Sequence, residues 1–124
     1  MAWNDYRSSP PVGTLLGDLA TLADGTVGSQ MIDSGQGGFP VLLVASQGLV
    51  RAFVNLCPHQ DLPLDYRSAD ILSADGSLLL CSNHQAGFRV DDGIGVLDLG
   101  HDCALERIPI AVDAAGLIRI ADDL

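Results

Sequence analysis

Apolar and polar residues alternate along most of the chain, in short stretches that are separated by turn residues. The clearest pair of stretches covers residues 39–45 and 49–56, with Ser46-Gln47-Gly48 between them. Alternation on both sides of a glycine-containing turn predicts a β-hairpin. In residues 49–56 both alternating sets are mostly apolar, so we expect a central strand that is covered on both faces.

The same pattern of short strands and turn signals recurs along the rest of the sequence. Asp-Gly pairs mark the predicted turns at Asp24, Asp75 and Asp92, and Asp18 is placed to cap one turn of helix. Short strands at such spacing are typical of an all-β fold with antiparallel sheets. We expect strands over residues 14–16, 26–32, 39–45, 49–56, 71–73, 77–80, 88–90, 95–97, 108–112 and 117–121, and a helical turn over 18–23.

The length of 124 residues fits one domain, and no repeat, low-complexity tract or linker divides it. We therefore expect residues 1–124 to form a single domain. Residues 1–13 contain two prolines and no periodicity, which predicts a loose N-terminal arm. Within it Trp3 and Tyr6 either pin the arm to the body or are disordered with it.

The charge of the chain narrows the choice of partners. There are six Arg and no Lys against sixteen acidic residues, giving a net charge of −10, and every acidic residue except Glu106 is Asp. Such a chain is a poor candidate for binding nucleic acid or an anionic membrane. The longest apolar run, residues 39–45, is too short to span a bilayer, and we expect a cytoplasmic protein.

Two short motifs carry the candidate chemistry. Each of them, Cys57-Pro58-His59 and Cys81-Ser82-Asn83-His84, places one thiol and one imidazole within a few residues, and residues 60–80 separate them. Thiolate and neutral imidazole bind both zinc and iron, so mononuclear zinc with these four ligands is one interpretation. Because each loop gives Cys and then His, two parallel loops could instead present both sulfurs to one metal and both nitrogens to another. That division suits a [2Fe–2S] centre in which two His replace two Cys on one iron.

The stretches CPHQDLPL and CSNHQAGFRVDDGIGV resemble the two cluster loops of Rieske [2Fe–2S] proteins. The resemblance implies one [2Fe–2S] cluster per chain, with Cys57 and Cys81 on the inner iron and His59 and His84 on the outer iron. It also implies layered antiparallel sheets with the cluster at one tip, in a cluster-binding part over residues 57–102. Cys103 and His101 are left outside the ligand set.

The chain departs from the family pattern at several positions in and beside these loops. Asp61 and Gln85 stand where the family has glycine, which supplies positive φ and close backbone approach. Residues 100–103 replace a proline-containing loop that often shields the cluster. Relatives of high potential have other side chains, namely cysteines at Leu62 and Asn83 and hydroxyls at Ala86 and Phe88, so we expect a low potential.

The sequence separates the possible roles of such a centre. An oxygenase needs a second iron held by two His and a carboxylate, and only His101 remains after the cluster is served. We therefore expect an electron carrier rather than an enzyme, which passes electrons from a flavin-type reductase to a terminal oxygenase or similar acceptor. Residues 57–102 hold eight Asp against two Arg, which favours docking on basic surfaces. The alternative is a non-redox interaction module, stabilised by zinc or a cluster, or a small subunit of a reductase complex.

Overall fold

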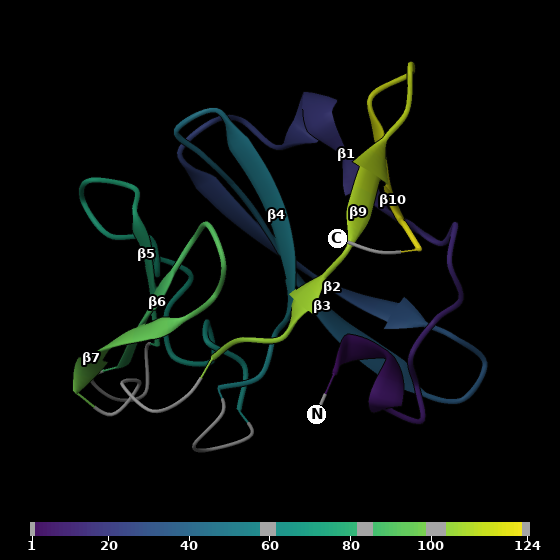
Figure 1. Ribbon diagram of the computed structural model, residues 1–124, viewed down its shortest axis with the longest axis horizontal. Coiled ribbons are helices and arrows are strands. Elements are labelled where there is room, and N and C mark those ends of the chain that lie inside the picture. Colours follow the sequence, from purple (N-terminus) through teal and green to yellow (C-terminus); the bar gives the residue numbers. More distant parts are fainter. Residues whose placement is uncertain (1, 58–61, 82–85, 99–103, 123–124) are drawn as a thin grey trace.

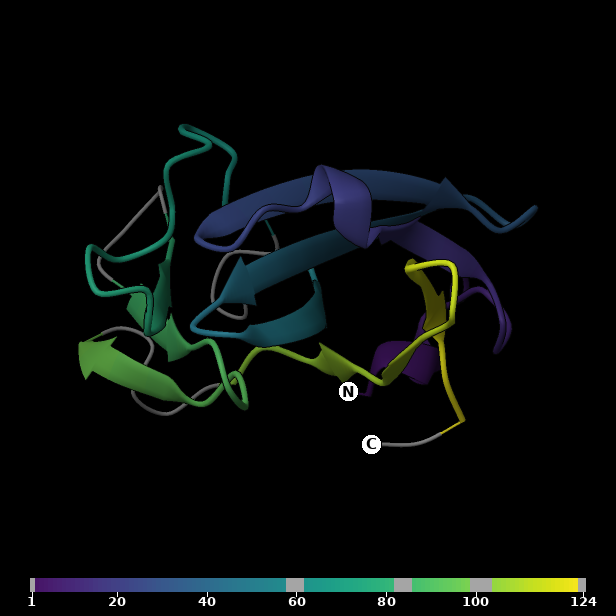
Figure 2. The same ribbon diagram turned by 90° about the horizontal axis from the view of Figure 1, so that it is seen from above.

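The computed structural model describes residues 2–57, 62–81, 86–98 and 104–122. These residues form ten β-strands and two short 3₁₀ helices, which confirms the all-β prediction. The strands make three antiparallel sheets, A, B and C (Figure 1). In Figure 2 sheet C lies to one side of the long strands of sheet B, and sheet A lies to the other.

Sheet B is the centre of the molecule and contains the predicted hairpin. Its first two strands are paired from Thr26 with Ala45 to Asp33 with Gly38. The turn into the next strand has two residues, Gln47 at φ +55° and Gly48 at φ +78°, and two positive φ angles are what a type I′ hairpin turn requires. The sheet order is β2 (Thr26–Asp33), β3 (Gly38–Ser46), β4 (Leu49–Val54) and β8 (Arg107–Ile108).

Sheet A joins the two ends of the chain, and sheet C is built from the middle of the sequence. The short helix η2 (Leu19–Thr21) follows the first strand of sheet A, and the side chain of Asp18 caps it by accepting from the amide of Ala20 at 2.9 Å, as predicted. Sheet A has the order β1 (Leu15–Asp18), β10 (Leu117–Ile120), β9 (Ile110–Val112), and sheet C the order β5 (Leu78–Leu80), β6 (Ala86–Arg89), β7 (Gly95–Asp98).

The central strands β3 and β4 of sheet B place buried side chains on both faces, as the sequence predicts for β4. Alternate residues of this strand face opposite ways, so that Phe53 belongs to one buried cluster while Ala52 and Val54 belong to another. The first cluster also contains side chains from sheet C, and the second contains side chains from sheet A. Sheet B therefore separates two cores, one for each neighbouring sheet.

The N-terminal arm packs on the second core, which is one of the two alternatives left open by its sequence. It begins with the 3₁₀ helix η1 (Trp3–Asp5), whose Trp3 contacts that core. The hydroxyl of Tyr6 donates to Glu106 Oε1 at 2.7 Å, and its ring meets the ring of Phe39 edge-on with centroids 6.0 Å apart. Tyr6 and Trp3 therefore pin the arm to the body, and at its end the amide of Gly13 donates to the carbonyl of Ile120 at 2.8 Å.

The strand predicted over residues 108–112 is in fact two strands in different sheets. β8 ends at Ile108 and pairs with β4, while β9 begins at Ile110 and pairs with β10. Pro109 lies between them and has no backbone N–H to donate to β4, while its carbonyl accepts from the amide of Ala121 at 2.9 Å. The chain changes sheet at this residue.

The chain leaves sheet B after β4 and returns to it at β8, directly beside β4. Ala52 is paired with Ile108, and Phe53 with Arg107. Residues 55–106 lie between these two neighbouring strands in sequence and contain the whole of sheet C. Among the described residues, no helix is long and apolar enough to cross a membrane.

Candidate metal centre

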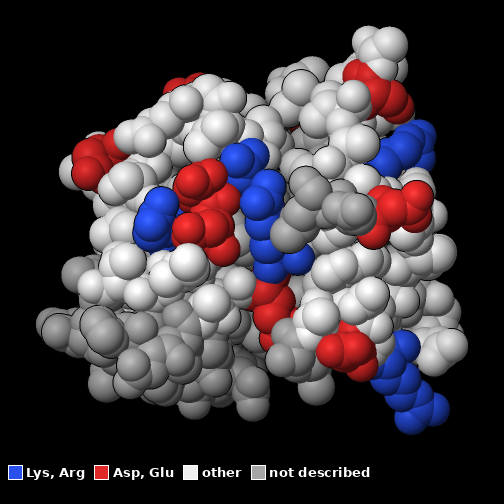
Figure 3. Space-filling model, in the orientation of Figure 1, with Lys and Arg blue, Asp and Glu red and all other residues white. Residues whose placement is uncertain are grey.

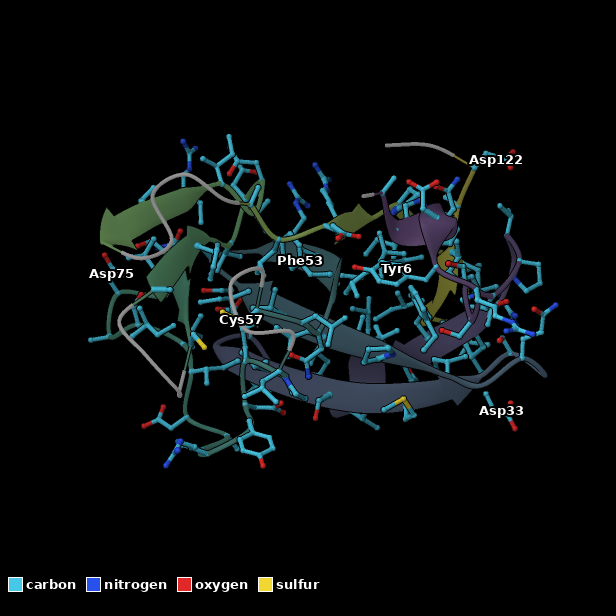
Figure 4. The ribbon with its side chains drawn as sticks, turned by 90° about the horizontal axis from the view of Figure 1, so that it is seen from below. Tyr6, Asp33, Phe53, Cys57, Asp75 and Asp122 are labelled. Carbon is cyan, nitrogen blue, oxygen red and sulfur yellow. The ribbon has the colours of Figure 1, made fainter. Side chains whose placement is uncertain are left out.

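Cys57 and Cys81, the two cysteines of the motifs, lie in the same core. Cys57 follows β4 and Cys81 follows β5, so that a strand of sheet B and a strand of sheet C each deliver one thiol. Cys57 is fully buried and Cys81 is 7% exposed, and both belong to the cluster between the two sheets. In Figure 4 Cys57 lies between sheet C and the side chain of Phe53. The fold thus brings together two thiols that are distant in sequence.

Each cysteine begins a loop that is closed in the same way. The amide of Cys57 donates to the carbonyl of Leu62 at 2.7 Å, and the amide of Cys81 donates to the carbonyl of Ala86 at 3.0 Å. Both hydrogen bonds therefore join a cysteine to the fifth residue after it. The two loops have the same length and the same closing bond, although one leaves sheet B and the other is the hairpin loop of β5 and β6.

The other predicted ligands lie outside the described residues. His59 belongs to the range 58–61 and His84 to the range 82–85, and the same ranges contain Asp61 and Gln85. His101 and Cys103 also fall outside, in the range 99–103. The described part of the chain contains no alternative group of three or more His, Cys, Asp or Glu side chains that could hold a metal ion.

The chemistry of the described residues fits an iron–sulfur centre. Thiolates are the protein ligands of iron–sulfur clusters, and the two thiols here lie in one apolar core rather than on an open surface. Phe53, Leu64 and Leu79 belong to the same buried cluster as the two thiols, and this cluster excludes water. Such surroundings are among the factors that set the redox potential of a metal site.

Two further positions near the second loop belong to the same core. Ala86 is 2% exposed and Phe88 is fully buried, and both are on β6 immediately after the loop. The resemblance to the Rieske family implies hydroxyl groups at these two positions in relatives of high potential. Because Ala86 and Phe88 share a buried cluster with both cysteines, a hydroxyl at either position would enter the surroundings of the thiols.

A network of hydrogen bonds fixes the turn before β5. Asp75 Oδ1 accepts from the Ser77 hydroxyl at 2.7 Å, the Ser73 hydroxyl at 2.8 Å and the Ser77 amide at 3.0 Å. These bonds, with that of the Ser77 hydroxyl the strongest, lower the pKa of Asp75 to about 2. The Ser46 hydroxyl donates to the carbonyl of Gly76 at 2.6 Å, so the turn is also attached to sheet B.

The acidic excess of residues 57–102 is partly balanced by arginines. Arg51, on β4, lies 3.1 Å from a carboxylate oxygen of Asp91 and also donates to the carbonyl of Asp91 at 3.0 Å. Arg89 lies 3.6 Å from Asp92 and 3.8 Å from Asp91. Figure 3 shows acidic and basic side chains next to one another on this face. In contrast, Asp70 and Asp75 are exposed, and neither forms an ion pair with another described residue.

Asn55 is a residue of the site that the sequence reasoning missed. It lies two positions before Cys57 and is 4% exposed. Its Oδ1 accepts from the amide of Leu64 at 2.9 Å, and its Nδ2 donates to Asp65 Oδ1 at 3.0 Å. Asn55 is an amide side chain in a mostly apolar stretch, two residues before a predicted ligand. A polar side chain buried there needs hydrogen-bond partners, and this need is the sequence signal that could have identified it.

Comparisons with known proteins agree with this arrangement. The ferredoxin of carbazole 1,9a-dioxygenase from Nocardioides aromaticivorans IC177 is similar in structure, with a TM-score of 0.71 and 22% identity, covering 90% of this chain and 98% of that chain. A ferredoxin from Sphingomonas yanoikuyae B1 gives a TM-score of 0.67 and 19% identity, covering 89% and 98%. A chain in the complex of reduced oxygenase and oxidised ferredoxin in carbazole 1,9a-dioxygenase gives 0.70 and 17%, covering 90% and 94%.

The comparison with curated proteins finds no match. The family model described as "Rieske [2Fe-2S] domain" matches residues 18–99, which include both motifs and both loop-closing hydrogen bonds. The chain belongs to the Rieske [2Fe–2S] domain family.

Proposed function

We propose that this Rieske domain is a one-electron carrier that takes electrons from a flavin-type reductase and passes them to a terminal oxygenase. The observation that carries the proposal is the pair of buried cysteines, Cys57 and Cys81, at the start of two equally closed loops in a chain of this family. When bound, a [2Fe–2S] cluster accepts and releases one electron.

The proposed ligand set is that implied by the resemblance. Cys57 and Cys81 hold the inner iron, and His59 and His84 hold the outer one. The two thiols are on the core side of their loops, so the apolar cluster protects the sulfur ligands from water. The whole chain, residues 1–124, acts as one domain in this proposal, with residues 57–102 as the cluster-binding part. A reducing cytoplasm is the proposed location, where Cys103 is a thiol rather than half of a disulfide.

Metal analysis and EPR of the purified protein test the cofactor. We expect two iron atoms and two acid-labile sulfides per chain and a Rieske EPR signal after reduction with dithionite. Cys57→Ser, His59→Ala, Cys81→Ser and His84→Ala should each abolish that signal and lower stability, since cluster binding contributes to folding free energy. Cys103→Ser and His101→Ala are the matched controls and should keep it. A colourless protein that contains zinc, or a normal signal in Cys81→Ser, would contradict the proposal.

The partner is proposed from charge and from a neighbouring structure. One of the similar structures is a complex of an oxygenase with a ferredoxin, and the net charge of −10 here favours a basic docking surface on the acceptor. Electron transfer to such an acceptor should slow as ionic strength rises to 0.15 M, where the screening length is about 8 Å. Stopped-flow reduction of the acceptor measures this rate. A rate that does not depend on salt would show that the acidic residues do not guide docking.

A further inference from the structure

The two loops start alike but are supported differently beyond their closing bonds. In the second loop the bond between Cys81 and Ala86 continues directly into the β5–β6 ladder, where Leu80 is paired with Gly87 and Leu79 with Phe88. Backbone hydrogen bonds therefore hold both arms of that loop together.

The first loop has no such ladder on its returning arm. Pro63 follows Leu62 and has no N–H to donate, and residues 62–65 form no strand. Asn55 stands opposite Leu64 in the register that pairs Cys57 with Leu62. Here the side chain of Asn55, rather than its backbone, accepts from the amide of Leu64, at 2.9 Å.

The same side chain also reaches the next residue of the returning arm. Asn55 Nδ2 donates to Asp65 Oδ1 at 3.0 Å, while the backbone amide of Asn55 donates to the carbonyl of Pro40 on β3 at 3.0 Å. Asn55 is thus anchored in sheet B through its backbone and holds residues 64 and 65 through its side chain. Asn55 and Leu64 are both buried, so water does not freely replace the hydrogen bond between the Asn55 side chain and the Leu64 amide.

From these contacts we infer that Asn55 is a positioning residue for the first cluster loop, and that its side-chain amide replaces the backbone ladder that supports the second loop. The inference rests on the proposed function, because only that function makes the loop a cluster loop. The hydrogen bonds of Asn55 to Leu64 and Asp65 do not depend on the cluster. Asn55 fixes the distance between the two ends of the loop that starts at Cys57 and contains His59. A change at Asn55 should therefore alter how firmly the loop holds a cluster.

The pairing of Asn55 with Asp65 allows a test by exchange of the two groups. Asn55→Ala removes both side-chain bonds. Asn55→Asp keeps an acceptor for the amide of Leu64 but places a carboxylate against the carboxylate of Asp65. In the double variant Asn55→Asp with Asp65→Asn, the donor and the acceptor change places, and both hydrogen bonds can form again.

The rate at which an iron chelator removes the cluster, and the EPR spectrum of the reduced protein, report the effect. The buried amide of Leu64 loses its partner in Asn55→Ala, and two carboxylates face each other in Asn55→Asp. Each change should raise the rate of cluster loss about tenfold or more, with a broadened or shifted EPR signal. The exchanged pair should return the rate to within about threefold of wild type and restore the spectrum, since each hydrogen bond regains a donor and an acceptor.

Ser46→Ala is the matched control. Ser46 is also a buried polar residue whose side chain bonds to the backbone of another segment. Its hydroxyl donates to the carbonyl of Gly76, which lies on the turn before β5 rather than on a cluster loop. It should lower the thermal midpoint while leaving the EPR spectrum unchanged. Cluster loss in Asn55→Ala that is no faster than in Ser46→Ala, or an exchanged pair that behaves like Asn55→Asp, would overturn the inference.

Hydrogen exchange measured by mass spectrometry on a peptide containing Leu64 separates this inference from the proposed function. In Asn55→Ala, the amide of Leu64 should exchange about tenfold faster or more, with or without a cluster. If wild type lacks a Rieske signal and Leu64 is still protected by Asn55, the proposed function fails, while the support of residues 64 and 65 by Asn55 stands. If wild type has the signal and exchange at Leu64 is the same in Asn55→Ala, the inference fails.

Discussion

Gly93 lies in the turn between β6 and β7, where sheet C meets the rest of the molecule. Its φ is +79°, and its amide donates to the carbonyl of Arg89 at 2.7 Å, while its carbonyl accepts from the amide of Leu105 at 2.8 Å. A Cβ at this position would be 2.9 Å from the carbonyl oxygen of Leu105 and 2.9 Å from a ring carbon of Phe53. We predict that Gly93→Ala is strongly destabilising, because the backbone and the buried ring of Phe53 cannot both move away.

The expected size follows from two terms. An alanine in the left-handed region costs about 1–2 kcal/mol, and forcing extra volume against a packed core adds about 1–3 kcal/mol. Gly48→Ala is the control, because Gly48 has φ +78° and its Cβ would meet nothing within 4 Å. It should lose only the first term, about 1–2 kcal/mol, whereas Gly93→Ala should lose roughly 2–5 kcal/mol.

Thermal unfolding of the cluster-loaded protein, followed by circular dichroism and by visible absorbance, measures the difference. For a chain of this length 1 kcal/mol corresponds to a shift of about 4 °C in the midpoint. If Gly93→Ala and Gly48→Ala differ by less than about 0.5 kcal/mol, the contact with Leu105 and Phe53 does not restrain the hairpin, and the reasoning from the close approach is wrong.

Two further predictions concern the potential and the response to acid. Protein-film voltammetry should give a potential of roughly −150 mV that barely changes with pH near neutrality, and Ala86→Ser combined with Phe88→Tyr should raise it; a wild-type value above about +100 mV would contradict this prediction. For Asp75, the pKa of about 2 in the folded protein lies below the ordinary value of 3.8, so its carboxylate stabilises the fold above pH 4 and loses this effect as the pH falls toward 2. The denaturation midpoint of wild type should therefore exceed that of Asp75→Asn at pH 5, by less at pH 3, and approach it near pH 2, and a constant difference from pH 5 to pH 2 would show that Asp75 does not titrate as described.

The sequence predicts most strands because their signals are local. The turn at Gln47 and Gly48, the alternation on both sides of it, and the cap at Asp18 are each contained within a few residues, and the structure confirms them. Sheet membership is a different matter, because it depends on partners far away in sequence. The split of the expected strand 108–112 at Pro109 could be suspected from proline alone, but the two sheets it joins could not.

The site divides in a similar way. The ligand motifs can be predicted from sequence because Cys57 and Cys81 each have a histidine within three residues. The structure shows in addition that both thiols lie in one core. The predicted places of His59 and His84 on the outer iron remain predictions. The role of Asn55 could not be predicted from sequence, since its partner Leu64 is brought next to it only by the folding of the chain.

The pairing of β4 with β8 brings the two ends of the cluster-loop segment next to each other. Because Ala52 and Phe53 are hydrogen-bonded neighbours of Ile108 and Arg107, residues 55–106 start and finish one strand spacing apart, about 4.8 Å. Closing a connection of this length instead of a two-residue turn costs only roughly 3 kcal/mol of chain entropy, since each doubling of length adds about 0.6 kcal/mol. Residues 55–106 are thus a long insertion between two neighbouring strands, and the side chains that cover sheet C come from the same sheet B that holds both ends of the insertion.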